Sequence, residues 1–189
     1  MKQACVPSVT STPVSVRRLG AALAVCALLW TGAVHADEYG DVNQLLKSGK
    51  YSEALNKADM FLASKSRDPQ MRFLKGVILT EMGRPVDAVN AFQALTQDYP
   101  ELPEPYNNLA ALYAQQNQLD KARAALEMAV RINPNYAVAH ENLGDVYARL
   151  ASQSYNKALQ LDTSSTALPA KLTAVRSVLN PPSRTAARK

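Results

Sequence analysis

The sequence has little of the side-chain chemistry that enzymes and metal sites use, with two cysteines and two histidines among 189 residues. Cys5, Cys26 and His35 all lie within the first 36 residues, and only His140 lies beyond them. Residues 37–189 therefore hold no disulfide, no thiol nucleophile and no cysteine-based metal site. Motifs for a phosphate-binding loop or a serine nucleophile are also missing, so the sequence predicts no catalytic residue, no metal and no cofactor.

A basic surface of the kind that binds nucleic acid is missing as well, although the formal net charge is +5. Between residues 37 and 180 there are 15 Lys and Arg against 16 Asp and Glu. The positive excess lies at the two ends of the chain, at Lys2, Arg17, Arg18, Arg184, Arg188 and Lys189. We therefore expect no nucleic-acid partner.

The first 36 residues have the organisation of a secretory signal peptide. Arg17 and Arg18 precede the apolar run 19–30, and the stretch ends in Val-His-Ala at residues 34–36. A positive region, a short apolar region and small residues at the cleavage site predict cleavage between Ala36 and Asp37. An uncleaved anchor helix is the alternative, but the 16 residues from Leu19 to Val34 are marginal for crossing about 30 Å of hydrocarbon. We expect export to the periplasm of a Gram-negative bacterium, with no stable membrane anchor after cleavage.

Residues beyond the signal repeat with a period of 34. Several residue types keep this one register, which makes the signal far stronger than a single matched motif. The matching sets are Gly76, Ala110 and Gly144; Ala54, Ala88 and Ala122; Leu109 and Leu143; Tyr113 and Tyr147; Gly49 and Gly83; Pro100 and Pro134.

Each period has the pattern of two amphipathic helices joined by a tight turn. Apolar residues recur at helical spacing on both sides of the turn, which holds Gly49 in the first unit, Gly83 in the second and Asn117 in the third. Glycine and asparagine tolerate the left-handed backbone that ends a helix. Small residues at Gly76, Ala110 and Gly144 are expected to let the paired helices approach closely.

This pattern resembles the tetratricopeptide repeat, a 34-residue helix-turn-helix unit. The third unit matches best, through Tyr106, Leu109, Ala110, Tyr113, Ala122, Ala129 and Pro134. The resemblance implies an all-α fold, a right-handed α-solenoid of antiparallel helix pairs. We divide it into a degenerate first unit at 37–68 and full units at 69–102 and 103–136, although Arg72 and Lys75 replace the apolar residues usual in the second.

The fourth unit departs from the pattern because its second half arrives five residues early and lacks the turn glycine. We therefore expect residues 137–163 to hold one long helix, about 137–161, in place of a helix pair. A capping helix is expected within 164–180, with Pro169 in its first turn. The basic segment 181–189 is expected to be disordered.

The resemblance also implies a partner-binding groove lined by the first helix of each unit. An asparagine amide both donates and accepts, so Asn108 and Asn142, one period apart, either bind the backbone of an extended peptide or hydrogen-bond within the stack. Phe73 and Val77 replace the basic clamp that some family members use for a terminal carboxylate. The groove residues are Phe73, Val77, Thr80, Asn107, Asn108, Ala111, Gln115, Glu141, Asn142, Asp145 and Arg149.

These observations favour a non-enzymatic periplasmic adaptor that binds another protein or an extended peptide, in envelope assembly or secretion. A self-associating structural subunit of an envelope complex is the alternative, and the oligomeric state stays open. His140 stands where a helix-packing residue is usual, so we expect a half-buried structural role for it. Glu141 and Asp145 are expected to be solvated or to pair with Arg149.

Overall fold

The computed structural model describes residues 38–179. The expected signal peptide, its cleavage site at Ala36 and Asp37, and the basic segment 181–189 lie outside this range. The chain divides into two compact units, residues 1–41 and 42–189. Of the first unit only residues 38–41 are described, and the fold below is that of residues 42–179 of the second.

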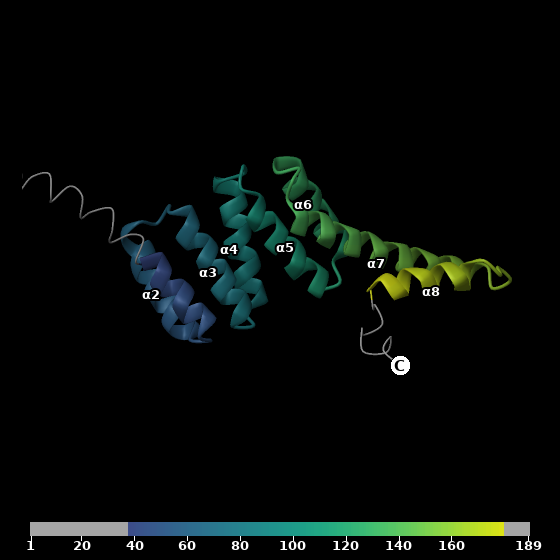
Figure 1. Cartoon of the computed structure of the whole chain (residues 1–189), viewed down its shortest axis with the longest axis horizontal. Coiled ribbons are helices and arrows are strands. Elements are labelled where there is room, and N and C mark those ends of the chain that lie inside the picture. Colours follow the sequence, from purple (N-terminus) through teal and green to yellow (C-terminus); the bar gives the residue numbers. More distant parts are fainter. Residues whose placement is uncertain (1–37, 180–189) are drawn as a thin grey trace, which may run out of the picture. The chain divides into compact units, whose positions relative to one another are not determined.

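The described chain is a succession of helices, and no strand occurs between residues 38 and 179 (Figure 1). Residues 38–47 are helical. The helices that follow are α2 (Tyr51–Ser64), α3 (Pro69–Glu81), α4 (Pro85–Asp98), α5 (Pro103–Gln115), α6 (Leu119–Ile132), α7 (Ala137–Leu161) and α8 (Leu168–Leu179). Each of these helices packs against the next in the chain, and α5 also contacts α7. This is the packing of an α-solenoid, in which every unit touches only its neighbours, so the expected fold class is confirmed.

The three turn residues adopt the left-handed backbone that the sequence predicts. Their φ angles are +72° at Gly49, +67° at Gly83 and +58° at Asn117. At each turn the next amide reaches back to a carbonyl five residues earlier, as in the bond of 3.0 Å from Arg84 N to Leu79 O. This pairing satisfies carbonyls that the end of the helix would leave without partners. The same cap therefore ends the first helix of three successive units.

Close approach within the second unit depends on Gly76. A Cβ atom at this position would lie 2.6 Å from a ring carbon of Phe92, which is fully buried on α4. Any larger residue at position 76 would therefore displace the Phe92 ring, which fills the space between α3 and α4.

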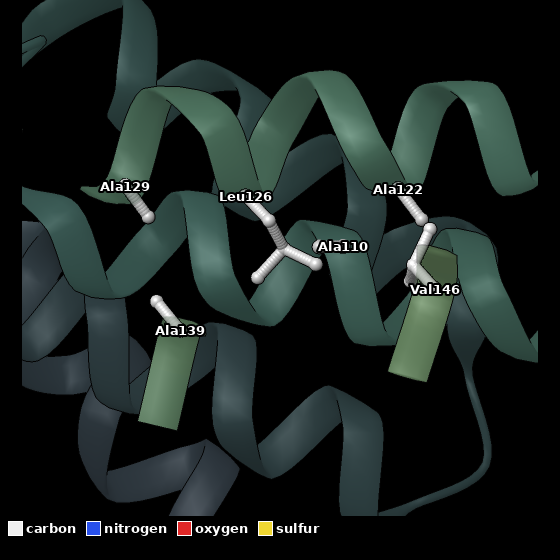
Figure 2. Packing of buried hydrophobic residues seen from close by; sticks show 6 residues of the cluster. All are labelled: Ala110, Ala122, Leu126, Ala129, Ala139 and Val146. Carbon is white, nitrogen blue, oxygen red and sulfur yellow. The ribbon is translucent and has the colours of Figure 1, made fainter. Parts of the chain in front are cut away.

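The core between the third and fourth units is built from small side chains. Figure 2 shows Ala129 of α6 pointing toward Ala139 of α7, and Ala122 of α6 toward Val146 of α7, around the central side chain of Leu126. All five are buried. The alanine side chain is a single methyl group. Alanines at these positions therefore let α6 and α7 pack close together.

α7 is one continuous helix of 25 residues, Ala137–Leu161, with the bounds expected from the sequence. The expectation of close packing at Gly144 is wrong, because nothing lies within 4 Å of a Cβ built there. The fourth unit has no second helix that folds back at this point. Its place is taken by α8, which packs on α7 and buries Leu172.

Two charged residues of α3 occupy positions where the repeat usually has apolar side chains. Arg72 Nη1 lies 2.7 Å from Asp98 Oδ2 of α4, and Lys75 Nζ lies 2.7 Å from Asp59 Oδ1 of α2. Ion pairs to both flanking helices thus replace apolar packing at the borders of this unit.

Candidate interaction groove

Two pockets of about 200 Å³ lie between successive first helices. The α3–α5 pocket is lined by Pro69, Gln70, Phe73, Leu102, Glu104 and Pro105. The α5–α7 pocket is lined by Ala110, Ala111, Ala114, Leu126, Asn142, Asp145, Val146, Arg149 and Leu179. We call the surface that joins them the groove. Pockets of this size accept single side chains, because sites for small-molecule ligands usually exceed about 300 Å³.

One stripe of α5 connects the two pockets. Glu104, Asn108, Ala111 and Gln115 are spaced by four, three and four residues, so they share one side of the helix. Glu104 lines the first pocket and Ala111 the second. The predicted groove residues of α5 therefore lie on the same side as both pockets, with the exception of buried Asn107.

The asparagines form bonds within the stack. Asn142 Nδ2 donates to Asn107 Oδ1 at 2.9 Å, which links α7 to α5, and Asn108 Nδ2 donates to the Glu104 carbonyl at 2.9 Å. Asn107 is only 9% exposed. Of the two alternatives left open by the sequence, the structure thus shows hydrogen bonding inside the stack.

Arg149 also binds the stack, and it does not pair with Glu141 or Asp145. Its Nη1 donates to the Ala114 carbonyl at 2.9 Å, and its Nη2 lies 3.4 Å from Asn117 Oδ1. The guanidinium therefore caps the C-terminal end of α5, where carbonyls lack helical partners and a cation is favoured. Of the two alternatives expected for Glu141 and Asp145, pairing with Arg149 is absent and both side chains are exposed to solvent.

The remaining predicted groove residues of α3 differ in their roles. Phe73 lines the α3–α5 pocket, and its ring centroid lies 5.6 Å from that of Phe92. Val77 packs against the core cluster around Phe92. Thr80 donates its hydroxyl to the Gly76 carbonyl at 3.0 Å within the same helix. Of these three, Phe73 alone lines one of the two pockets of the groove.

His140 is exposed, and the expectation of a half-buried side chain is wrong. Its Nε2 lies 2.9 Å from the Pro134 carbonyl in the loop before α7. Ala139, one residue earlier, has the buried position against α6 instead. The histidine thus ties the start of α7 to the preceding loop.

Charge is distributed unequally between the two kinds of helix. On the second helices α2, α4 and α6, every carboxylate is in an ion pair with a lysine or arginine: Glu53, Asp59, Asp87, Asp98, Asp120 and Glu127. On the first helices α3, α5 and α7, four exposed carboxylates have no ion pair within residues 38–179: Glu81, Glu104, Glu141 and Asp145. The groove is therefore acidic, whereas the acidic residues of the second helices are matched by cations.

Glu104 is a groove residue that the sequence prediction missed. Burial of Tyr136 and the negative charge of Glu104 both raise the pKa of the Tyr136 hydroxyl. Glu104 has glutamine and valine one period before and after it, at residues 70 and 138, so the repeat gives no signal for a carboxylate. Leu179 was missed too, because no repeat pattern fixes where the helix after the fourth unit ends.

Among residues 38–179, no three His, Cys, Asp or Glu side chains cluster as metal ligands would. No helix in that range combines the length and the apolar character needed to cross a membrane.

Family models match the chain in two places. A tetratricopeptide repeat model matches residues 39–103, and a TPR repeat model matches residues 111–150. Together they span more than half of the chain. The chain belongs to the tetratricopeptide repeat (TPR) family.

Among sequence relatives, the TPR chain is 36% identical over 77 residues to the chloroplastic tetratricopeptide repeat domain-containing protein PYG7 of Arabidopsis thaliana. The match covers 38% of this chain and 26% of that protein. A second Arabidopsis relative, the TPR repeat-containing thioredoxin TTL4, is 30% identical over 59% of this chain and 16% of its own length. The chain thus spans about a quarter or less of the curated relatives it matches.

Solved structures of TPR proteins share the fold. A thermophilic TPR protein from Thermus thermophilus superposes with a TM-score of 0.56 at 25% identity, covering 77% of this chain and 82% of that one. The first TPR of Spaghetti (RPAP3), bound to an HSP90 peptide, gives 0.57 at 18% identity over 60% and 90%. The Yersinia enterocolitica secretion chaperone SycD, in complex with a peptide of the translocator YopD, gives 0.52 at 16% identity over 76% and 93%.

Proposed function

We propose that this TPR protein is a non-enzymatic adaptor whose groove binds an extended segment of another protein. The adaptor class follows from the family and the fold. The location of the binding surface, the extended form of the ligand and the compartment belong to the proposal.

The observation that carries the proposal is the pair of pockets on either side of α5, one beside Glu104 near its start and one beside Ala111 farther along the helix. Each is lined largely by apolar atoms, from Phe73 and Pro105 in one and Ala111 and Val146 in the other. An extended segment lying across α5 would place one side chain in each pocket, because alternate residues of an extended chain point to the same side. Two shallow pockets favour modest affinity, and a Kd of about 1 μM corresponds to roughly −8 kcal/mol.

Peptide binding by other proteins of this fold supports the same form of ligand. RPAP3 and SycD are both described with a bound peptide. The groove of this chain differs in chemistry from a clamp for a terminal carboxylate, because it has Phe73 and Val77 in place of basic residues and carries carboxylates that form no ion pair within residues 38–179. We therefore propose that the partner segment is internal to its protein or bears positive charge.

A steric block in the α5–α7 pocket tests the proposal. Ala111→Trp adds a large ring at an exposed position of this pocket, and Ala124→Trp adds the same ring at an exposed position of α6. Proteins captured from extracts of the source cell by the wild type and by Ala124→Trp should include a shared partner. We expect Ala111→Trp to recover at least tenfold less of it. Equal recovery by both tryptophan variants would exclude the groove as the binding surface.

Export is the second part of the proposal, and it rests on the signal-like composition of residues 1–36. We propose that the adaptor works in the periplasm, in envelope assembly or secretion. Fractionation of the source cell followed by N-terminal sequencing tests this directly. A mature chain that begins at Asp37 in the periplasmic fraction is expected, and an intact chain in the cytoplasmic fraction would contradict it.

A further inference from the structure

Arg72 and Lys75 of α3 depart from the pattern of the repeat. They stand one period before Tyr106 and Leu109, which pack into the apolar core. Two cations in the second unit therefore replace two apolar side chains of the third. The groove does not use them, because neither residue lines its pockets.

The two cations line a cavity of about 320 Å³ on the side of α3 that faces α2 and α4. We call this cavity the outer pocket, and its lining residues are Leu62, Ser66, Arg72, Lys75, Ala91 and Ala94. Gln70 and Phe73, which line the groove, lie on the opposite side of α3, because successive residues of a helix are turned by about 100°. The outer pocket is larger than either pocket of the groove and exceeds the size of about 300 Å³ at which small-molecule sites begin.

Positive charge dominates the outer pocket. Among the described residues, those that line it include two cations and no carboxylate. The carboxylates that pair with the cations lie farther out: the side chains of Asp98 and Asp59 are 58% and 48% exposed, against 17% for Arg72 and 36% for Lys75. The positive groups therefore face the cavity, whereas the negative groups face solvent.

The cavity beside the outer pocket has a balanced charge. It shares Lys75 and Ala91 with the outer pocket, and it adds Arg84 together with the carboxylates of Asp59 and Asp87. Arg84 and Asp87 form an ion pair of 2.7 Å there. An anion therefore gains more from the outer pocket than from this neighbour.

Both cations of the outer pocket keep hydrogen-bond donors for a ligand. A guanidinium has five N–H donors, and within residues 38–179 the Arg72 side chain hydrogen-bonds only from Nη1 to Asp98. An ammonium has three donors, and Lys75 Nζ lies 2.7 Å from Asp59 Oδ1. Because residues three apart are neighbours on the surface of a helix, the remaining donors of the two side chains can converge on one anionic group.

We propose that the outer pocket binds the carboxylate of a ligand that also has an apolar body. Arg72 and Lys75 hold the carboxylate, because a guanidinium fits its two oxygens and an ammonium adds a point charge. Leu62, Ala91 and Ala94 contact the apolar body. The carboxylate belongs either to a small molecule or to a side chain of another protein. The site lies across α3 from the groove, so it does not depend on the proposed function.

Titration of the full chain, followed by NMR of the backbone amides and of the Arg72 Nε–H, tests the site. The probes are hexanoate, its neutral analogue hexanamide, a blocked peptide with one internal glutamate, and the same peptide with glutamine. We expect hexanoate or the glutamate peptide to bind with a Kd of about 1 mM, and the neutral analogues to bind at least tenfold more weakly. Hexanoate binding assigns the site to a small molecule, and binding of the glutamate peptide alone assigns it to a partner's side chain. Failure of both carboxylates to bind, or equal binding of their neutral analogues, would overturn the proposal.

A variant that restores the repeat separates binding from stability. Arg72→Tyr with Lys75→Leu inserts the residues found one period later in the sequence. Its Tm should be at least that of the wild type, because replacing partly buried ion pairs by apolar residues is often neutral or stabilising. Its affinity for the carboxylate probe should fall at least tenfold, and an unchanged affinity would overturn the proposal. Lys121→Gln with Arg131→Gln is the matched control, because it removes two cations from exposed positions of α6 and should alter the affinity less than about twofold.

Removal of the competing carboxylates should act in the opposite direction. Asp59→Asn with Asp98→Asn releases both cations at exposed positions and should strengthen probe binding about three- to tenfold, because exposed ion pairs compete only weakly with a ligand. Equal or weaker binding would contradict the assignment of the carboxylate to Arg72 and Lys75.

The two proposals fail separately. Ala111→Trp, designed to block the groove, should leave the affinity for the carboxylate probe within about twofold of the wild type. Loss of probe binding in this variant would place the probe in the groove and overturn the outer pocket as its site. Unchanged partner capture by the same variant would overturn the proposed function and leave the outer pocket standing.

Discussion

Asn142 of α7 donates its side-chain amide to Asn107 of α5 across 2.9 Å, which joins two successive units of the solenoid by a hydrogen bond between residues 35 positions apart. Asn107 is almost fully buried, so its oxygen depends on this donor. Together with the bond from Arg149 to the Ala114 carbonyl, this pair links α7 to α5.

Removal of the donor is expected to destabilise the fold. Asn142→Ala leaves the Asn107 oxygen without this partner, which costs about 1–3 kcal/mol. Asn108→Ala is the control, because its amide bonds only to the Glu104 carbonyl of its own helix. We expect the control to change the free energy of unfolding by less than about 0.5 kcal/mol. Urea unfolding measures both, and equal losses would show that the bond between units contributes no extra stability.

The same substitution should have opposite effects at two glycines of the repeat. Gly76→Ala places a Cβ 2.6 Å from the Phe92 ring and is expected to cost about 1–3 kcal/mol through overpacking. Gly144→Ala meets nothing within 4 Å and is expected to stabilise α7 by about 0.5–1 kcal/mol, because alanine is the better helix former. Thermal unfolding followed by circular dichroism distinguishes the two. A stabilising effect at Gly76 would contradict the close approach of α3 and α4.

Removal of the arginine cap is expected to weaken the end of α5. Arg149→Met keeps the aliphatic stem and loses the bond to the Ala114 carbonyl, at a cost of about 1 kcal/mol. Arg131→Met is the control, since Arg131 is exposed near the end of α6. Hydrogen exchange of the amides in the turn at residues 116–118 should accelerate in the first variant alone. Unchanged exchange there would show that the guanidinium does not hold the turn.

The turn after α7 is expected to depend on pH through Asp162. Its Oδ1 accepts from the Ser164 amide at 3.0 Å and from the Ser164 hydroxyl at 2.6 Å, and these bonds lower the pKa of Asp162 below 3.8. A lowered folded pKa means that the ionised carboxylate stabilises the turn above about pH 3.8, and that this stabilisation is lost as the pH falls through the folded pKa.

Titration of the Asp162 carboxyl carbon by NMR measures this pKa, and Ser164→Ala should move it upward toward 3.8. The difference in unfolding free energy between the wild type and Asp162→Ala should be present at neutral pH and vanish in acid. A pKa at or above 3.8 in the wild type would contradict the turn geometry.

The positions of the helices and turns can largely be predicted from local sequence preferences. Gly49, Gly83 and Asn117 mark the turns because few residues adopt positive φ, and the loss of such a residue in the fourth unit predicts the unbroken α7. The close packing expected at Gly144 fails for a related reason. The repeat pattern predicts a small residue at position 144. Close packing there also requires a second helix in the fourth unit, and that helix is absent because α7 continues unbroken to Leu161.

The hydrogen-bond partners of the groove residues could not be predicted in the same way. Ala111 and Asp145, which the family pattern assigns to the groove, both line the α5–α7 pocket, but the partners of Asn142 and Arg149 lie 35 residues away in sequence. Competition between a bond within the stack and a bond to a ligand depends on distances that spacing does not give. The ion pairs of Arg72 and Lys75 are of the same kind, because they depend on how α3 packs between α2 and α4.

The unbroken α7 limits how this array can grow by duplication. A further 34-residue unit inserted between α4 and α5 could pack on both, because these helices already present the faces on which successive units pack. A unit added after Leu161 would meet a helix whose second half is covered by α8 and offers no helix pair to stack on. Lengthening of the gene by whole repeats is therefore compatible with the fold in the middle of the solenoid and incompatible with it beyond the fourth unit.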